Sequence, residues 1–311
     1  MRGKPLPGSH LKLVFHLKEP VVSEEGIDIV IVPAAFSQFK IAERRETCSW
    51  LKPLVAATTN DTRVLYFAYD LELDGTDIKK LQQETNTQQR PVLFICHSLG
   101  GLILKQALWI AHQHTPDAET PTLEDVTSGI LFLGSPHTTS KDDKNWENRK
   151  WILKSTRKDV PKQSLTDEDI GHIGEVCQHF EKLDLHIRVI SVFEANKSKV
   201  RDSLLKFIRS DTNRQILFDQ QLCQTGSRYE ETFEVDADHN SMWLVKVDSH
   251  FYNRLVKLFR SVTEEAPGDV ALLCNKPVFN DSLTLHSEPI NRSSENNINS
   301  RHTSPNLYDE T

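Results

Sequence analysis

The chain alternates short, continuous apolar runs with longer stretches of helical periodicity. The apolar runs that we predict to be strands cover residues 27–32, 63–69, 91–96, 129–134 and 187–193. Each run is continuous rather than alternating, which is typical of strands that are buried on both faces of a parallel sheet. The pattern therefore predicts an α/β protein with a mostly parallel, doubly wound sheet.

Helical segments lie between these runs. Residues 102–112 are apolar enough to form a buried helix, and residues 251–259 repeat the helical spacing near the end of the folded part. Residues 166–183 place apolar side chains on one stripe, and Thr166 with Asp169 resembles a capping box at the helix start. Strands that alternate with helices indicate βαβ units, and we find no internal repeat.

Length and charge favour one large domain followed by a tail. We assign residues 1–22 to an N-terminal extension, residues 23–262 to the domain and residues 263–311 to a disordered tail that is rich in Asn, Ser and acidic residues. The tail holds eight acidic and three basic residues of a chain whose net charge is −7, so the domain itself is nearly neutral. This balance argues against a nucleic-acid-binding protein.

Cysteine usage and hydropathy indicate a cytoplasmic location. The five cysteines form no CxxC pair and no metal-ligand spacing, which predicts reduced thiols and no metal site. No run reaches the roughly 18 apolar residues of a membrane span, and the basic start lacks the apolar core of a secretory signal. Residues 141–162 are polar and basic around Trp146 and Trp151, and we predict a solvated excursion there. Peripheral contact with an intracellular membrane is the alternative, and the oligomeric state is not specified.

The segment PVLFICHSLGGLILKQALWI carries the candidate chemistry. A buried strand leads into Ser98 and then into an apolar helix, which is the strand–turn–helix context of a nucleophile elbow. Such a turn needs small residues two before and two after the serine, and Cys96 and Gly100 occupy these positions. The Leu99 N–H at the helix start is the predicted oxyanion donor. The alternative is that Ser98 is only a turn residue or a helix cap.

A serine nucleophile needs a base and an orienting acid, and in this fold the chain order is Ser, acid, His. Glu194 ends a predicted strand and is the candidate acid, with Asp238 and Asp70 as alternatives. His239 follows the strand-like run EETFEV and is the candidate base.

Two further histidines lie near the predicted site. His97 precedes the serine, so its side chain points away from that of Ser98, and we predict a packing or hydrogen-bonding role. His137 follows the next strand at the catalytic end of the sheet, where it holds a loop or contacts substrate. Both are candidate pocket residues.

The motifs CHSLGGLILKQAL, GILFLGSPH, VISVFE and DADHNSM, in this order, resemble the α/β-hydrolase domain of the serine-active-site-containing, lipase-like family. Similar domains stand at the N-terminus of fungal NACHT, ankyrin and TPR proteins. The resemblance covers residues 27–262 and implies Ser98 as nucleophile, Glu194 as acid and His239 as base. It also implies esterase- or lipase-like activity on a small-molecule or lipid ester, without a cofactor.

One departure from this family motivates a second hypothesis. The family has a glycine-rich loop after the first strand, whereas this chain has Pro33, Ala34 and Ala35. Proline has no N–H, so the second oxyanion donor falls to the amide of Ala34 or Ala35. Losing one such donor typically costs about 10²–10³ in rate. A catalytically weakened interaction or signalling module is therefore the alternative to a serine esterase, and thioesterases and peptidases share the same triad.

Overall fold

The computed structural model describes residues 11–16, 26–34, 49–56, 62–67, 90–113, 122–137, 167–183, 185–199 and 214–274. All of them belong to one compact unit that spans residues 1–276. Of the tail predicted to be disordered, residues 263–311, the part after Cys274 lies outside the described residues, as does the predicted excursion with Trp146 and Trp151.

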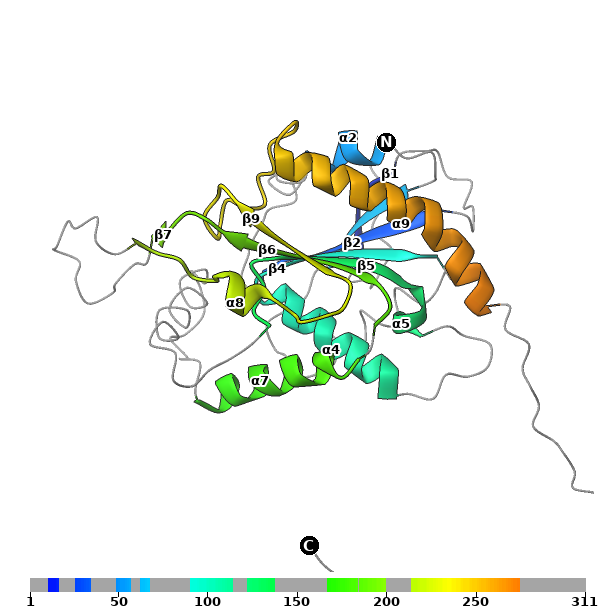
Figure 1. The fold of residues 1–311 in the computed structure, drawn as a ribbon. Coiled ribbons are helices and arrows are strands. Elements are labelled where there is room, and N and C mark those ends of the chain that lie inside the picture. Colours follow the sequence, from blue (N-terminus) through cyan, green and yellow to red (C-terminus); the bar gives the residue numbers. More distant parts are fainter. Residues whose placement is uncertain are drawn as a thin grey trace, which may run out of the picture. The chain divides into compact units, whose positions relative to one another are not determined.

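A seven-stranded sheet forms the centre of this unit (Figure 1). Its strands are β1 (Leu11–His16), β2 (Ile27–Val32), β3 (Thr62–Phe67), β4 (Val92–His97), β5 (Thr127–Leu133), β6 (Arg188–Glu194) and β9 (Glu230–Val235). Their spatial order is β1-β3-β2-β4-β5-β6-β9. Every neighbouring pair is parallel except β1 with β3. The five apolar runs and the EETFEV run are therefore confirmed as strands. Two short strands, β7 (Ser198–Lys199) and β8 (Arg214–Gln215), pair separately.

Helices cover both faces of the sheet. The longer ones are α4 (Gly100–Gln113), α7 (Asp167–Glu181) and α9 (His250–Cys274), and the shorter ones are α2 (Leu51–Ala56), α5 (Leu123–Val126) and α8 (Gln220–Cys223). Helices α9 and α2 lie over one face, and α4 and α7 over the other (Figure 1). This three-layer arrangement confirms the predicted α/β fold class with a mostly parallel, doubly wound sheet.

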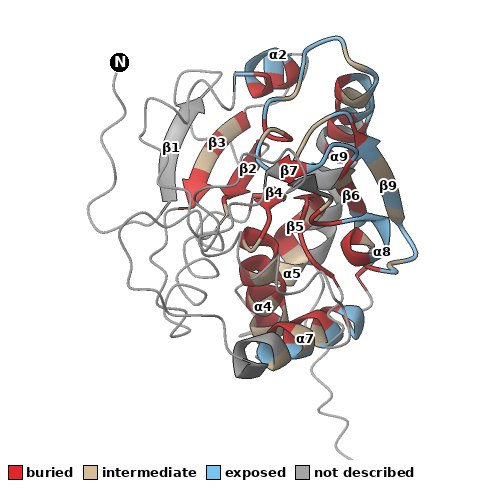
Figure 2. Ribbon diagram, turned by 90° about the vertical axis from the view of Figure 1, so that its left-hand side faces the viewer, coloured by how far each residue is buried: buried red, intermediate tan, exposed pale blue. Residues whose placement is uncertain are grey.

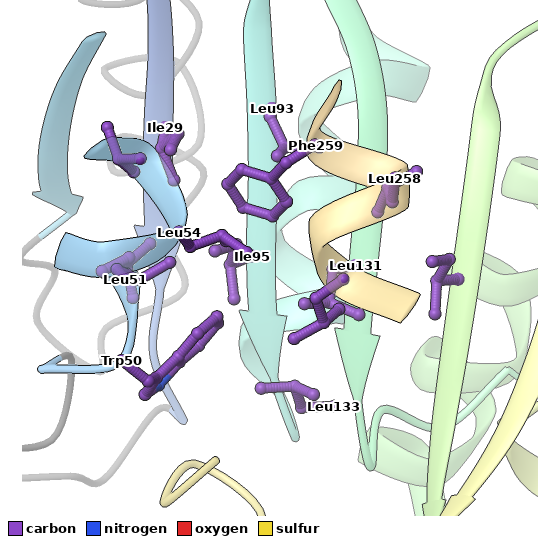
Figure 3. Close-up of a cluster of buried hydrophobic side chains, with 14 of the residues drawn as sticks. Ile29, Trp50, Leu51, Leu54, Leu93, Ile95, Leu131, Leu133, Leu258 and Phe259 are labelled. Carbon is purple, nitrogen blue, oxygen red and sulfur yellow. The ribbon is translucent and has the colours of Figure 1, made fainter. Parts of the chain in front are cut away.

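Successive side chains along a strand point to opposite faces of the sheet, and this explains why the apolar runs are continuous. In β4, Leu93 and Ile95 face the α2–α9 side, whereas Phe94 and Cys96 face the α4–α7 side. Figure 3 shows Phe259 of α9 approaching Leu93 and Ile95. Because helices cover both faces of the strand, burial of every apolar side chain stabilises the fold. The strand therefore shows no alternation of apolar and polar residues. By contrast β9, at the sheet edge, is only partly buried (Figure 2).

Two predicted domain boundaries differ from the structure. Strand β1 belongs to the sheet although we assigned residues 1–22 to an extension, because its antiparallel pairing with β3 is a long-range contact. Helix α9 runs past the predicted boundary at residue 262 to Cys274. A helix that is anchored by packing, here through Leu255 and Phe259, extends with one hydrogen bond per added residue.

The order of the strands locates the crevice of the sheet. From β2 the chain moves outward to β3, then returns to β4 on the other side of β2, and continues to β5 in the opposite direction. Ligands of open α/β sheets bind beyond the carboxyl ends of the strands at such a reversal. The reversal lies between β2 and β4, whose carboxyl ends carry Pro33 and Ser98.

Candidate active site

Ser98 occupies a strained turn directly after β4. Its φ is +53°, in the left-handed region that side chains other than glycine rarely adopt. The Ser98 N–H donates to the carbonyl of Leu133 at 2.9 Å, which holds the turn against the neighbouring strand. A non-glycine residue in this region costs energy, and it persists where the surrounding structure holds it. This is the backbone geometry expected of a nucleophile elbow.

Packing against neighbouring segments explains the two glycines after the elbow. A Cβ atom on Gly100 would lie within 3.0 Å of three backbone atoms of Val32 and Pro33. A Cβ atom on Gly101 would lie 2.5 Å from the Ser135 hydroxyl oxygen. The start of α4 therefore fits closely between the loops that follow β2 and β5.

His239 reaches the serine from a distant part of the chain. Its Nε2 atom lies 3.0 Å from the Ser98 hydroxyl oxygen, across 141 residues of sequence. The main chain of His239 is held on both sides: its N–H donates to the Ser198 hydroxyl at 3.0 Å, and its carbonyl accepts from His97 Nε2 at 2.9 Å. The structure thus brings the predicted nucleophile and the predicted base within hydrogen-bond distance.

Glu194 lies in the same buried cluster, but its carboxylate is bonded to other groups. One oxygen accepts from the amides of Leu217 and Phe218, the latter at 2.8 Å, and the other accepts from the Ser198 hydroxyl at 2.9 Å. In the part of the chain that the structure describes, His239 Nδ1 has no hydrogen-bond partner. The predicted acid is therefore near the base without a direct bond to its imidazole ring.

The imidazole Nδ1 atom instead faces the loop after β5. A Cβ atom on Gly134 would lie 2.8 Å from His239 Nδ1 and 2.9 Å from the Met242 sulfur. Gly134 also has a positive φ of +55°. Glycine is needed at this position both for the backbone conformation and for the close approach of the ring.

Burial sets the protonation states of the site. It lowers the pKa of His239 well below its ordinary value, and the nearby His97 acts in the same direction. Burial also raises the pKa of Glu194 to about 7, against the stabilising hydrogen bonds from the Phe218 and Leu217 amides, the Ser198 hydroxyl and the His239 main chain. At neutral pH the imidazole is uncharged, which is the form that accepts a proton from a serine.

His97 and His137 are both buried close to this cluster. Burial lowers the pKa of His97 to about 4, against the hydrogen bond to the His239 carbonyl. The His97 ring packs 4.9 Å from that of His239 and 5.3 Å from that of Trp243, and its Nε2 atom is bonded to the His239 carbonyl. Its place in a substrate pocket stays a prediction.

His137 holds a loop through its main chain. Its N–H donates to the Leu222 carbonyl at 2.7 Å, while neither ring nitrogen has a partner among the described residues. Burial lowers the pKa of the ring well below its ordinary value, with a further contribution from the charge of Lys105.

Asp238 and Asp70 are the alternative candidates for the acid. Asp238 accepts hydrogen bonds from the main-chain N–H and hydroxyl of Ser241, at 2.8 and 2.7 Å, and so closes the turn after β9. Asp70 lies outside the described residues.

The predicted oxyanion donors are only partly described. Within the described segments the Leu99 N–H has no hydrogen-bond partner, as an oxyanion donor requires in the absence of substrate. Ala34 follows Pro33 after the end of β2 and already interacts with another group of the protein. Ala35 lies outside the described residues.

Sequence reasoning missed two polar residues that support the cluster. Ser198 joins Glu194 to the His239 main chain, and no local pattern marks a serine four residues after a strand-ending glutamate. Lys105 is fully buried, and its Nζ atom donates to the Pro136 carbonyl at 2.6 Å. Its position in the apolar repeat of α4 was the available signal, because a lysine on a buried stripe needs an internal partner.

No cluster of three or more metal-ligating side chains occurs in the described ranges. None of the helices in that part of the chain is both long and apolar enough to cross a membrane.

Comparisons with known proteins give distant similarities. No family model matches the chain. Protein SERAC1 of Danio rerio is 28% identical over 106 residues, which are 28% of this chain and 16% of that protein. Protein SERAC1 of Homo sapiens is 26% identical over 149 residues, which are 41% of this chain and 22% of that protein. The matched part of the chain thus spans less than a quarter of the length of these relatives.

Solved structures with a related arrangement share little sequence with this chain. A carboxylesterase structure from Nitrososphaera gargenis has a TM-score of 0.46 and 10% identity, and the match covers 84% of this chain and 98% of that one. Alpha/beta hydrolase domain-containing protein 10 from mouse has a TM-score of 0.44 and 10% identity, with 82% and 94% covered.

Proposed function

We propose that this protein is a serine hydrolase that cleaves a carboxylic ester through an acyl-enzyme. The observation that carries the proposal is the 3.0 Å contact between Ser98 Oγ and His239 Nε2, on a serine whose φ is +53° at the carboxyl end of a central strand. A serine in this strained conformation lowers the stability of the fold. We attribute the strain to catalysis, because a base that can activate the serine lies within hydrogen-bond distance.

The reaction follows from the positions of these groups. Ser98 Oγ attacks the ester carbonyl while His239 Nε2 accepts the hydroxyl proton. The oxyanion of the tetrahedral intermediate accepts a hydrogen bond from the Leu99 N–H and, in our proposal, a second from the amide of Ala34 or Ala35. His239 then returns the proton to the departing alcohol. A water molecule, activated by the same imidazole, hydrolyses the acyl-enzyme and restores Ser98.

We assign Glu194 the role of the acid. Its ionised carboxylate lowers the free energy of the imidazolium that forms during the reaction, and it fixes the surrounding loops through its hydrogen bonds. The cluster needs no metal or organic cofactor for these steps. A lipid ester is the favoured variant of the substrate because of the family resemblance, and the cytoplasmic or peripheral membrane location stays a prediction.

A catalytically weakened interaction module is the second candidate. Two observations favour it: Pro33 stands where the family has a glycine-rich loop, and His239 Nδ1 lacks a partner among the described residues. Both reduce the stabilisation of charge in the transition state. Such a module would keep the fold and its contacts and would bind a protein partner.

Labelling with a fluorophosphonate distinguishes the two candidates. This probe reacts covalently with activated serines, so we expect the wild type to be labelled and Ser98→Ala and His239→Ala not to be. All three proteins are compared at equal concentration after circular dichroism has shown that they are folded. Labelling that persists in Ser98→Ala would show that another nucleophile reacts. A folded wild type that is not labelled would favour the interaction module.

A further inference from the structure

The hydroxyl of Ser198 connects the candidate acid to the candidate base. Ser198 lies in β7, shortly after β6 ends at Glu194, and only 1% of its surface is exposed. Its hydroxyl donates to Glu194 Oε2 at 2.9 Å and accepts the His239 N–H at 3.0 Å. The directions of both bonds are consistent, because a hydroxyl has one proton to donate and lone pairs that accept.

The remaining hydrogen bonds of Glu194 and His239 do not join the carboxylate to the imidazole ring. The second oxygen of Glu194 is held by the amides of Leu217 and Phe218, and no described group is bonded to His239 Nδ1. The imidazole therefore takes its position from the main chain of residue 239, from the contact of its Nε2 atom with Ser98 and from ring packing against His97 and Phe218. That main chain is held by Ser198, and also by Glu194, on one side and by His97 on the other.

We propose that Ser198 is a positioning residue, whose hydroxyl fixes the segment of His239 to the carboxylate of Glu194 so that the imidazole meets Ser98. This role rests on the proposed hydrolase function and extends it. Reactivity depends steeply on such alignment, because a displacement of about 1 Å can cost about 100-fold in rate. Because other groups bind the substrate, we expect the loss of activity in a Ser198 variant to appear in kcat.

The test compares Ser198→Ala with a matched control, Ser191→Ala. Ser191 is also a fully buried serine bonded to a glutamate, Glu230, but it lies within β6, and among the described residues it has no hydrogen bond to His239. With a p-nitrophenyl butyrate substrate we expect Ser198→Ala to lose about 10- to 100-fold in kcat with an unchanged KM. Ser191→Ala should stay within about twofold of the wild type in kcat.

The pH profile of kcat/KM provides a measurement that a purely structural role would not change. The Ser198 hydroxyl stabilises the ionised form of Glu194 and so lowers its pKa. Without this donor the carboxyl stays protonated to higher pH, so the acid limb of the profile should move upward in Ser198→Ala. It should be absent in Glu194→Gln. If Ser198→Ala is not recovered in a folded form, Ser198→Cys, which keeps the volume but weakens both hydrogen bonds, is measured with the same expectation.

An acid limb at the wild-type pH in Ser198→Ala would overturn the proposal, whatever the loss in rate. A limb that persists in Glu194→Gln would overturn it as well, because the limb would belong to another group. The failure of the proposed function has a different signature: a folded wild type that neither hydrolyses the ester nor reacts with the fluorophosphonate.

Discussion

The residues around Ser98 show how a few close backbone approaches hold a reactive turn. Ser98 has a left-handed backbone, its N–H is bonded to the Leu133 carbonyl, and Gly100 packs directly against the main chain of Val32 and Pro33. Main-chain atoms cannot rotate away as the end of a flexible side chain can. The turn therefore tolerates little change in the residues that touch the loop after β2.

Gly100→Ala is the sharpest test at this scale. The added methyl group would lie within 3.0 Å of backbone atoms at Val32 and Pro33, so one segment must move. We expect a loss of about 1–3 kcal/mol in the free energy of unfolding, together with slower fluorophosphonate labelling. Urea unfolding measures the first and a labelling time course the second. A variant as stable and as reactive as the wild type would show that the start of α4 and the loop after β2 are not packed this closely.

At the scale of elements, the same substitution has the opposite sign where a glycine lies in a helix with free space around it. A Cβ atom on Gly171 of α7 would meet no atom within 4 Å. Alanine has a higher helix propensity than glycine and reduces the freedom of the unfolded chain. The environment of the element, and not the residue type, decides the effect.

Gly171→Ala should therefore stabilise the protein by about 0.5–1 kcal/mol without a change in labelling. The midpoint of urea unfolding, at an unchanged slope, measures this gain. It also serves as a control for Gly100→Ala, because the chemical change is identical. A loss of stability would indicate that α7 does not continue as a regular helix through residue 171.

Elements whose core faces are set by local sequence were predicted well. The five central strands and α4 follow from runs of apolar residues, since both faces of the sheet are covered. Strand β1 and the full length of α9 were not predicted. The first depends on pairing with β3, and the second on anchoring against the sheet, neither of which a local pattern records.

Across the whole molecule, buried histidines couple stability to pH. Burial lowers the pKa of His97 from 6.5 to about 4, and it lowers those of His137 and His239 as well. Because the unfolded chain binds these protons more readily, their contribution is complete above about pH 6.5 and is lost as the pH falls through the folded pKa. Glu194 acts in the opposite direction: its raised pKa makes stability fall as the pH rises from 4.5 to about 7.

Comparing wild type with His97→Gln isolates one of these contributions. Glutamine keeps a donor for the His239 carbonyl but does not titrate. Between pH 6.5 and 4 we expect the wild type to lose up to about 3 kcal/mol more than the variant in the free energy of unfolding. Urea titrations at several pH values measure this difference. Parallel losses in the two proteins would contradict a buried, neutral His97.

Local patterns are enough to predict the α/β fold class, the turn at Ser98 and the order of the three candidate site residues along the chain. Each of these depends on interactions between near neighbours: the periodicity of apolar residues, the small residues of a turn and the position of an acid at a strand end. Which side chains contact one another depends instead on the packing of segments that are far apart in the sequence. The bond between Ser98 and His239 spans 141 residues, and the link through Ser198, the amides that hold Glu194 and the close approach of Gly134 to the imidazole depend on how separate strands and loops pack. Such contacts leave no local signal, because each residue satisfies its own backbone preferences whether or not its distant partner is present.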